Sequence, residues 1–300
     1  MYDIIILGSG PAGLTAALYS ARAGKKTLVL GGDQLGGQLN VIHRLENYPG
    51  FAGSGPELAE FMKKQAESFG AEVIMASAKT VTRNQEPGTS FKVIADNGQG
   101  FEAPVVIIAT GAKPRKMDII GAREFIGRGV SYCATCDGFF FTDRDVMVIG
   151  GGNSALSDAL YLAGVAKSVK ILYRKDSFSR AEDILVKRVM EAENIFVMWN
   201  TEIAEICGDD SGVKSVRTTG GTDIPTDGVF IAIGHEANTD YLDESIGRDE
   251  MGRLIPDALP TGMFVAGDVR SDIKMQVATA VGWGCECAMD AIAMLNKKSG

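Results

Sequence analysis

Short runs of consecutive apolar residues recur along this chain, and two of them lead directly into glycine-rich turns. Residues 4–7 read IIIL before GSGPAG, and residues 146–149 read VMVI before GGGNSA. A run of this length is typical of a strand buried on both faces of a parallel sheet, and the apolar residues after each turn recur with helical spacing. The pattern therefore predicts a strand, a tight turn and a helix over residues 2–24, and again over residues 145–165.

These two segments open two halves of the chain that repeat the same order of elements. Each half continues with a second strand, a helix, a turn-rich β stretch and a closing strand that runs into a glycine. The second strands are expected at 25–32 and 168–175, the helices at 56–70 and 180–194, and the closing strands at 105–114 and 228–238. Because the whole order recurs, we predict two domains of one architecture.

The end of the chain is expected to return to the first domain. A third strand that runs into a glycine lies at 262–270, and a helical stretch of about Gln276–Lys298 follows it. The predicted fold class is α/β, with two Rossmann-like dinucleotide-binding domains, the second inserted into the first. The predicted boundaries are 1–115 with 239–300 for the first domain and 116–238 for the second.

Composition and charge narrow the class of protein. The formal net charge of −8 over 300 residues argues against nucleic acid and against an anionic membrane surface as partners. No apolar stretch of the sequence reaches the length that spans a bilayer, and we expect no signal peptide. The five cysteines are odd in number and unevenly spaced, which is typical of cysteines that are reduced or catalytic. We therefore expect a cytoplasmic protein.

Both glycine-rich turns match the phosphate-binding pattern of dinucleotide folds. They read Gly8-x-Gly10-x-x-Gly13 and Gly150-x-Gly152-x-x-Ala155. The first glycine permits a tight turn, the second lets a pyrophosphate approach the backbone, and the third position lets helix and strand pack closely. The following helix adds free N–H groups and a partial positive charge. Two such turns predict two dinucleotide sites, against the alternative of two purely structural turns.

The end of the second strand in each half bears on which dinucleotide binds. An NAD site usually places an acid there, which accepts a hydrogen bond from the ribose 2′-hydroxyl. The first half has Gly31 at this point. The second half has Tyr173, followed by the basic residues Arg174, Lys175 and Arg180. Basic side chains suit a 2′-phosphate, so the second half is predicted to bind NADP, and the alternative is a solvated basic loop without a ligand.

The segment SYCATCDG contains Cys133 and Cys136, three positions apart. Such a pair is half of a zinc site, a structural disulfide or a redox couple. A zinc site needs two further ligands, and the only histidines of the chain are His43 and His235. A structural disulfide is not expected in a reducing compartment. We therefore expect no metal and interpret the two cysteines as a redox couple.

Other residues with reactive or bulky side chains receive mainly structural interpretations. Cys285 and Cys287 lie on different faces of one helix and are interpreted as core residues, with a second redox pair as the alternative. Cys207 stands alone in a turn-rich stretch, and His235 lies either near a nicotinamide or in a hydrogen-bonded loop. For Phe139–Phe141, core packing is favoured over a docking surface.

Taken together, the motifs resemble those of low-molecular-weight thioredoxin reductases, which are flavoprotein disulfide reductases with two dinucleotide folds. The motifs that carry the resemblance are GSGPAG, GGQL, ENYPG, ATGAKPR, CATCDG, GGGNSA and AGDVR. They cover essentially the whole chain, in order and with similar spacing. The resemblance implies FAD on the first domain and NADPH on the inserted one. It also implies a homodimer that acts on thioredoxin or a thioredoxin-like protein.

The resemblance further implies which residues form the site. Electrons would pass from NADPH to FAD, then to the Cys133–Cys136 disulfide and finally to a thioredoxin disulfide. Cys136 would face the flavin, Cys133 would attack the substrate, and Asp137 would act as the nearby acid and base. FAD would be contacted by Gly8, Gly10, Pro11, Ala12, Gly13, Gly31, Gly37, Gln38, Leu39, Asn47, Val81, Ala109, Thr110, Gly111, Gly267, Asp268, Gln276, Val277 and Ala278. NADPH would be contacted by Gly152, Asn153, Ser154, Ala155, Arg174, Lys175, Arg180, Ile233 and Gly234.

Three positions depart from the pattern of that family. The family has His-Arg-Arg, three residues and a further Arg around the 2′-phosphate, whereas this chain has Tyr173, Arg174 and Lys175, with Arg180 one place late. Met275 replaces an arginine before the Gln-Val pair, and Trp283 replaces an aspartate beside the flavin. NADH, reduced deazaflavin and ferredoxin therefore stay open as donors, and a flavin dithiol oxidase is a further alternative.

Overall fold

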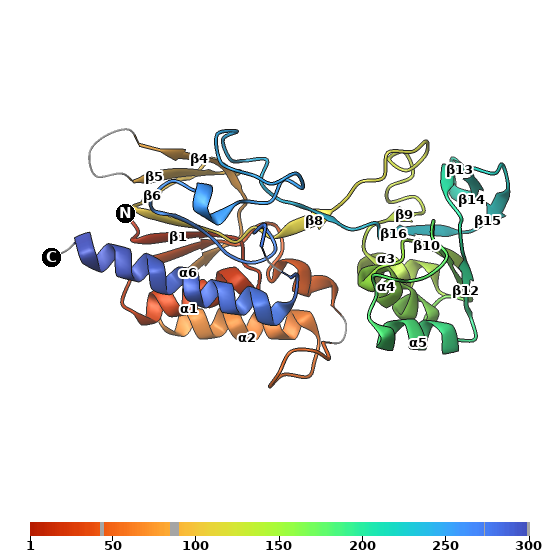
Figure 1. The fold of residues 1–300 in the computed structure, drawn as a ribbon, viewed down its shortest axis with the longest axis horizontal. Coiled ribbons are helices and arrows are strands. Elements are labelled where there is room, and N and C mark those ends of the chain that lie inside the picture. Colours follow the sequence, from red (N-terminus) through yellow and green to blue (C-terminus); the bar gives the residue numbers. More distant parts are fainter. Residues whose placement is uncertain (43–44, 85–89, 273, 299–300) are drawn as a thin grey trace. The chain divides into compact units, whose positions relative to one another are not determined.

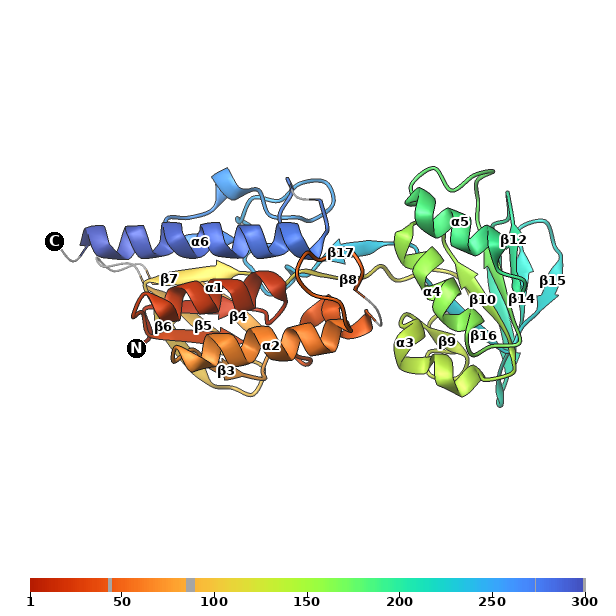
Figure 2. The same ribbon diagram turned by 90° about the horizontal axis from the view of Figure 1, so that it is seen from below.

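The computed structural model describes residues 1–42, 45–84, 90–272 and 274–298, so that His43 lies outside the described residues (Figure 1). The chain divides into two compact units, Met1–Lys113 with Glu236–Gly300, and Pro114–His235. The strands in which the chain passes between the units are β8 (Ala112–Pro114) and β17 (His235–Ala237), and they pair with each other (Figure 2). One unit is therefore an insertion within the other.

The first unit is built on a five-stranded parallel sheet. Its strand order is β18 (Met263–Val265), β7 (Val105–Ile108), β1 (Ile4–Leu7), β2 (Thr27–Leu30) and β3 (Glu72–Ile74). One face is covered by helices α1 (Pro11–Arg22), α2 (Gly55–Ser68) and α6 (Val277–Lys298) (Figure 2). The other face carries an antiparallel sheet of β4 (Ala78–Arg83), β5 (Phe91–Ala95) and β6 (Gly100–Ala103). Short 3-10 helices lie at Gly37–Val41 and Pro256–Ala258.

The central strand β1 explains why the sequence opens on four apolar residues. Ile4 and Ile6 pack into the core beneath α1 and α6, while Ile5 and Leu7 pack into the core on the opposite side. All four side chains are at most 1% exposed. Successive strand residues point to opposite faces, so a strand covered on both sides must be apolar throughout.

Helix α6 packs closely on the rest of the first unit, as Gly284 and Trp283 illustrate. A Cβ at Gly284 would lie 2.2 Å from the Ala12 carbonyl oxygen, so this glycine allows α6 and α1 to touch. Trp283 packs against the core under α6, and the Arg270 guanidinium lies 3.5 Å from the centroid of its ring. Arg270 also forms two hydrogen bonds to Asp272, at 2.8 and 2.7 Å. Trp283 thus has a packing role within this unit.

The second unit repeats the layered arrangement. Its five-stranded parallel sheet has the order β12 (Ile195–Met198), β11 (Ser168–Leu172), β10 (Asp145–Ile149), β16 (Gly228–Ile231) and β9 (Val130–Ser131). Helices α3 (Ala134–Asp137), α4 (Asn153–Ala163) and α5 (Asp183–Glu191) cover one face, and a 3-10 turn at Gly138–Phe141 follows α3. The antiparallel strands β13 (Ile203–Asp209), β14 (Gly212–Thr218) and β15 (Asp223–Pro225) cover the other face.

The observed elements confirm an α/β fold with parallel sheets, and two local differences have clear causes. Helix α5 begins at Asp183 rather than near residue 180, because the backbone of Arg180 pairs with that of Gly152 and is held out of the helix. Cys207, expected in a turn-rich stretch, lies within the strand β13, beside an irregularity in its pairing with β14. Among the described residues, no helix combines the length and apolar character needed to cross a membrane.

Candidate active site

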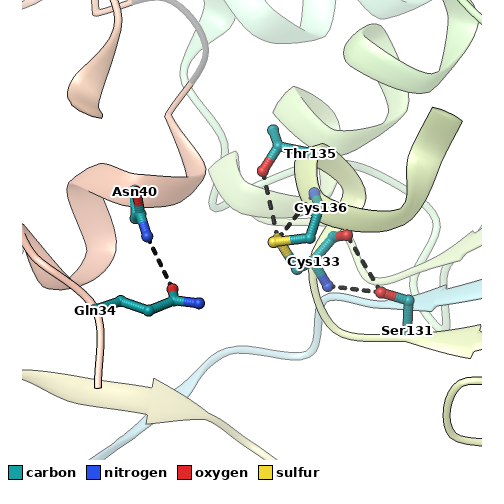
Figure 3. The surroundings of a disulfide bond; sticks show 6 residues. All are labelled: Gln34, Asn40, Ser131, Cys133, Thr135 and Cys136. Atoms are coloured by element: carbon teal, nitrogen blue, oxygen red, sulfur yellow. Dashed lines mark hydrogen bonds between the residues drawn. A yellow bond between two sulfur atoms is a disulfide. The ribbon is translucent and has the colours of Figure 1, made fainter. Parts of the chain in front are cut away.

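Cys133 and Cys136 form a disulfide bond at the short helix α3 (Figure 3). Cys133 is the residue that caps the N-terminus of this helix, and its Sγ accepts a hydrogen bond from the Cys136 backbone N–H at 3.1 Å. The Thr135 hydroxyl lies 3.3 Å from the same sulfur. Two donor-capable groups therefore face Cys133 Sγ, and such groups favour the thiolate form of a cysteine.

The backbone on either side of Cys133 is fixed by one side chain. The Ser131 hydroxyl accepts a hydrogen bond from the Cys133 N–H at 3.0 Å and donates to the Cys133 carbonyl oxygen at 3.2 Å. The Asp137 N–H in turn donates to the same carbonyl at 3.2 Å. Ser131 and Thr135 were not among the predicted site residues, although both lie within the segment that carries the cysteines.

Helix α3 rests directly on helix α4. Ala134, between the two cysteines, is 1% exposed and belongs to the core cluster that contains the buried face of α4. A Cβ at Gly138 would lie 2.9 Å from the ring of Tyr161, so this glycine lets the two helices approach closely. The disulfide is therefore presented from a packed support rather than from a free loop.

The three phenylalanines after the disulfide do not share one environment. Phe141 is half-buried and packs edge-to-face on Phe230, with ring centroids 5.3 Å apart. Phe139 and Phe140 are 76% and 72% exposed. The prediction that all three belong to the core is therefore wrong for two of them. The turn at Gly138–Phe141 rotates successive side chains around the chain, so only one of the three can face the sheet.

The glycine-rich turn of the first unit has the geometry of a phosphate-binding loop. Gly8 has φ +109°, and a Cβ there would lie 2.3 Å from the Ala109 carbonyl oxygen. A Cβ at Gly13 would lie 1.9 Å from the Gly8 carbonyl oxygen, which makes the close packing of α1 on β1 possible. At Gly10 the nearest atom to a Cβ would be 3.8 Å away. Contacts within the described chain thus require glycine at the first and third positions. At the second position, they would leave room for a Cβ.

The other residues predicted to hold FAD cluster at one edge of the same sheet. Gly8, Gly31, Ala109 and Gly267 lie just beyond the carboxyl ends of β1, β2, β7 and β18. Carboxyl ends of parallel strands meet at one edge, where dinucleotides bind in α/β folds. The further predicted residues Pro11, Ala12, Gly37, Gln38, Leu39, Thr110, Gly111, Asp268, Val277 and Ala278 begin a helix at that edge or lie in its loops. Val81 differs, because its side chain is buried in the core beneath β4.

Two pairs of predicted residues from distant parts of the chain meet at this edge. Gln38 Nε2 donates to Asp268 Oδ2 at 3.1 Å, and Asn47 Nδ2 donates to Gln276 Oε1 at 3.0 Å. Asp268 Oδ1 is buried and has no hydrogen-bond partner among the described residues. Burial raises the pKa of Asp268 above its usual range, and the bond from Gln38 only partly opposes this. A buried carboxyl oxygen without a partner is suited to a hydroxyl group of a bound ligand.

The glycine-rich turn of the second unit repeats this geometry. Gly150 has φ +145°, and a Cβ there would lie 2.2 Å from the Ala232 carbonyl oxygen. A Cβ at Gly152 would meet nothing within 4 Å. Helix α4 starts at Asn153, and in the described structure no side chain caps its N-terminus at Gly152. The second site therefore also leaves its middle glycine and a helix N-terminus open to a phosphate.

The end of β11 carries the residues predicted to meet a 2′-phosphate. Tyr173 is buried and stacks on Phe178, with ring centroids 5.5 Å apart, and Phe178 contacts Trp199 at 4.5 Å. The basic side chains of Arg174 and Arg180 are exposed and that of Lys175 is half-buried. None of these three side chains forms a hydrogen bond or ion pair with another described residue. The end of β11 thus combines packed aromatic rings with three basic side chains that have no partner among the described residues.

The remaining candidate residues have varied surroundings. Cys287 is buried, its Sγ donates to the Val265 carbonyl oxygen at 3.2 Å, and burial raises the pKa of its thiol to about 11. The core interpretation of Cys287 is thereby confirmed, whereas Cys285 is half-buried. Burial lowers the pKa of His235, which lies in β17. Ile233 is half-buried, and the Gly234 carbonyl oxygen accepts a bond from the Arg115 N–H.

Comparison with known proteins gives one consistent result. The model of the family described as pyridine nucleotide-disulphide oxidoreductase matches residues 2–284. A thioredoxin reductase from Rickettsia felis is 44% identical over 98% of this chain and 98% of its own length. The crystal structure of Lactococcus lactis thioredoxin reductase superposes with a TM-score of 0.91 at 38% identity, covering 99% of this chain and 100% of that one. The structure of T. acidophilum thioredoxin reductase gives 0.90 at 33% identity, with 98% of both chains covered.

This chain therefore belongs to the pyridine nucleotide-disulphide oxidoreductases, and within them to the thioredoxin reductase family. The resemblance carried by the sequence motifs is confirmed. The matched residues include both glycine-rich turns and the disulfide.

Proposed function

We propose that this protein is a cytoplasmic, FAD-dependent thioredoxin reductase that takes electrons from NADPH. The observation that carries the proposal is the Cys133–Cys136 disulfide, held on α4 within a unit that has its own open phosphate-binding turn. Bound FAD supplies the two-electron relay between a nicotinamide and a disulfide. The chain supplies the binding sites, the two thiols and the groups that move protons.

The first unit fits FAD. Gly10 leaves room for a pyrophosphate, and the N-terminus of α1 offers N–H groups to it. The oxygen of Asp268 that has no partner among the described residues is suited to a hydroxyl of the ribityl chain or ribose. Asn47 and Gln276 hold each other at the same edge of the sheet and would contact the flavin end.

The second unit fits a dinucleotide with a 2′-phosphate. Gly152 is open, no acid stands at the end of β11, and Arg174, Lys175 and Arg180 are unpaired within the described chain. These charges favour NADPH over NADH, because a 2′-phosphate gains charge-assisted hydrogen bonds and a 2′-hydroxyl does not. The aromatic Tyr173, where the family has histidine, weakens this preference, and NADH is the first alternative. Reduced deazaflavin and ferredoxin are the others.

The two cysteines carry out the exchange with the substrate. We assign the attack to Cys133, because the Cys136 N–H and the Thr135 hydroxyl stabilise negative charge on its sulfur. The Cys133 thiolate attacks one sulfur of the substrate disulfide, and the other substrate sulfur leaves as a thiolate. Cys136 then attacks Cys133 Sγ, which closes the internal disulfide and releases the second substrate thiol. Asp137, next to Cys136, supplies the proton for the leaving thiolate.

Phe139 and Phe140 support a protein as the substrate. They lie within four residues of the disulfide, and each exposes more than two thirds of its surface. Two adjacent exposed aromatic side chains are costly in water and are common as anchors in protein interfaces. We propose that they contact thioredoxin or a thioredoxin-like protein when its disulfide reaches Cys133.

A double variant tests this contact. Phe139→Ala with Phe140→Ala is expected to raise the KM for thioredoxin about tenfold, since losing two aromatic anchors costs about 1.4 kcal/mol or more. Reduction of a small aromatic disulfide such as DTNB should be unchanged. Ile184→Ala, at a residue 51% exposed on α5, serves as the control for loss of exposed apolar surface. Equal effects on thioredoxin and DTNB would contradict a docking role.

The electron donor is tested by anaerobic titration of the flavin absorbance. The purified yellow protein is mixed with NADPH, NADH, reduced deazaflavin or reduced ferredoxin, and thioredoxin reduction is then followed with each donor. We expect bleaching by NADPH at concentrations at least tenfold below those needed with NADH. Bleaching by another donor alone would overturn the NADPH assignment. Bleaching by a dithiol and none of the four would instead favour a flavin dithiol oxidase.

We also propose that the protein is a homodimer. An open pocket of about 230 Å³ lies between α1 and α2 on the first unit, and its lining is largely apolar, including Leu14, Leu18, Leu58, Phe61 and Met62. Phe61 is 62% exposed there. Apolar surface of this kind is stabilised when a second copy covers it.

A further inference from the structure

The start of α4 is joined to the segment before α5 by a reciprocal pair of hydrogen bonds. Asn153 Oδ1 accepts a bond from the Glu182 backbone N–H at 2.7 Å, and Asn153 Nδ2 donates to Glu182 Oε1 at 3.0 Å. Asn153 directly follows Gly152, the open glycine of the second phosphate-binding turn. Both polar groups of the Asn153 side chain are therefore used by one residue, 29 positions away in the sequence.

Two further contacts support this connection, one directly and one through Tyr173. The backbones of Gly152 and Arg180 form an isolated parallel bridge. Phe178 stacks on Tyr173, and a Cβ at Gly151 would lie 2.5 Å from the Tyr173 ring. The segment 178–182 is thus joined to the phosphate-binding turn directly at Arg180 and Glu182, and through Tyr173 at Phe178. We call this set of three contacts the loop clasp.

The loop clasp determines where one cation lies. Arg180 is in the middle of the clasped segment, and its own side chain is exposed and unpaired within the described chain. Relative to the family pattern, the arginine is displaced by one residue, because Ser179 takes the usual place. Pairing of the Arg180 backbone with Gly152 compensates for this displacement, since it fixes the residue beside the turn. A cation held in place binds a phosphate with less loss of conformational freedom.

We propose that Asn153 and Glu182 are positioning residues for the donor nucleotide. They act through the loop clasp: they hold the backbone of Arg180 beside the phosphate-binding turn, so that the guanidinium starts from a fixed position when it meets the 2′-phosphate of the nucleotide. Asn153 then influences the nucleotide through Glu182, besides the direct contact that the resemblance implied. This inference rests on the proposed use of NADPH.

The test is the affinity of the flavin-loaded protein for 2′,5′-ADP, measured by isothermal titration calorimetry, with 5′-AMP in parallel. Asn153→Ala and Glu182→Ala are each expected to weaken 2′,5′-ADP binding about tenfold and 5′-AMP binding less than threefold. Glu182→Gln keeps the acceptor oxygen and the backbone N–H, so it should stay within twofold of the wild type. Glu193→Ala, at an exposed acid beyond α5 in the same unit, is the matched control.

A second measurement reports on the clasp without any nucleotide. Trypsin cleaves after Arg180, and both alanine variants should be cut there several times faster than the wild type and the Glu193→Ala control. Affinity for 2′,5′-ADP within twofold of the wild type in both alanine variants would overturn the inference alone. Equal losses for 2′,5′-ADP and 5′-AMP would also overturn it, because the clasp would then not act on the 2′-phosphate. A wild-type protein that does not bind 2′,5′-ADP would overturn it together with the NADPH assignment.

Discussion

Replacing Cys136 by serine is expected to lower kcat/KM for thioredoxin at least about a thousandfold while the donor still reduces the flavin. Cys133 would keep a thiol that attacks a disulfide, but no neighbouring sulfur could close the internal disulfide afterwards. The substrate would therefore stay covalently attached. Cys133→Ser should cause a similar loss without such attachment, because the thiol that the Cys136 N–H and Thr135 hydroxyl stabilise is the one removed.

The two variants are distinguished by trapping the mixed disulfide with thioredoxin. Each is mixed with a single-cysteine thioredoxin whose thiol carries a thionitrobenzoate group, and release of the yellow anion is followed. Cys136→Ser should release about one equivalent and form a disulfide-linked complex on a non-reducing gel, whereas Cys133→Ser should release far less. Cys207→Ser, at a half-buried cysteine of β13, is the control and should retain turnover. The reverse trapping pattern would exchange the roles of the two cysteines, and turnover by either variant would exclude the dithiol mechanism.

The sequence was sufficient to predict those parts of the fold that depend on local pattern. Four apolar residues before a glycine turn identify β1 and β10, because only strands covered on both faces need such runs. The glycine spacing then gives the turn geometry, since a Cβ at Gly8, Gly13 or Gly150 would lie about 2 Å from a carbonyl oxygen, while the third position of the second turn is Ala155. The spacing can be recognised within a single short segment, although the carbonyl oxygens that require Gly8 and Gly150 belong to Ala109 and Ala232, which are distant in the sequence.

Features that depend on contacts between distant segments could not be predicted in this way. Exposure of Phe139 and Phe140 follows from the way the turn after α3 lies on α4, and three identical residues carry no periodicity that distinguishes them. The pairing of Asn153 with Glu182 joins residues from different elements. The resemblance implied that Asn153 matters but gave it a direct contact with the nucleotide. Side-chain geometry was needed to see that Asn153 also holds Glu182.

Alanine at the two open glycines is expected to separate ligand binding from folding. At Gly152, φ is −102° and a Cβ would meet nothing within 4 Å, so Gly152→Ala should change the free energy of unfolding of the protein without nucleotide by less than about 0.5 kcal/mol. The methyl group would nevertheless occupy the space through which a pyrophosphate reaches the backbone. We expect affinity for NADPH to fall about a hundredfold, as measured by calorimetry.

Gly10→Ala should weaken the binding of FAD in the same way, without preventing the protein from folding. Gly10 has φ −69° and ψ 179°, which any residue adopts, and its Cβ would lie 3.8 Å from the nearest atom, the Gly36 carbonyl oxygen. The variant should therefore fold but lose most of its yellow colour on purification. Gly220→Ala, in the turn between β14 and β15, adds a methyl group 3.7 Å from the Thr218 hydroxyl oxygen and is the control. If Gly10→Ala retained a full complement of FAD, a close approach of the pyrophosphate at this glycine would be excluded, since no contact within the described chain requires glycine there.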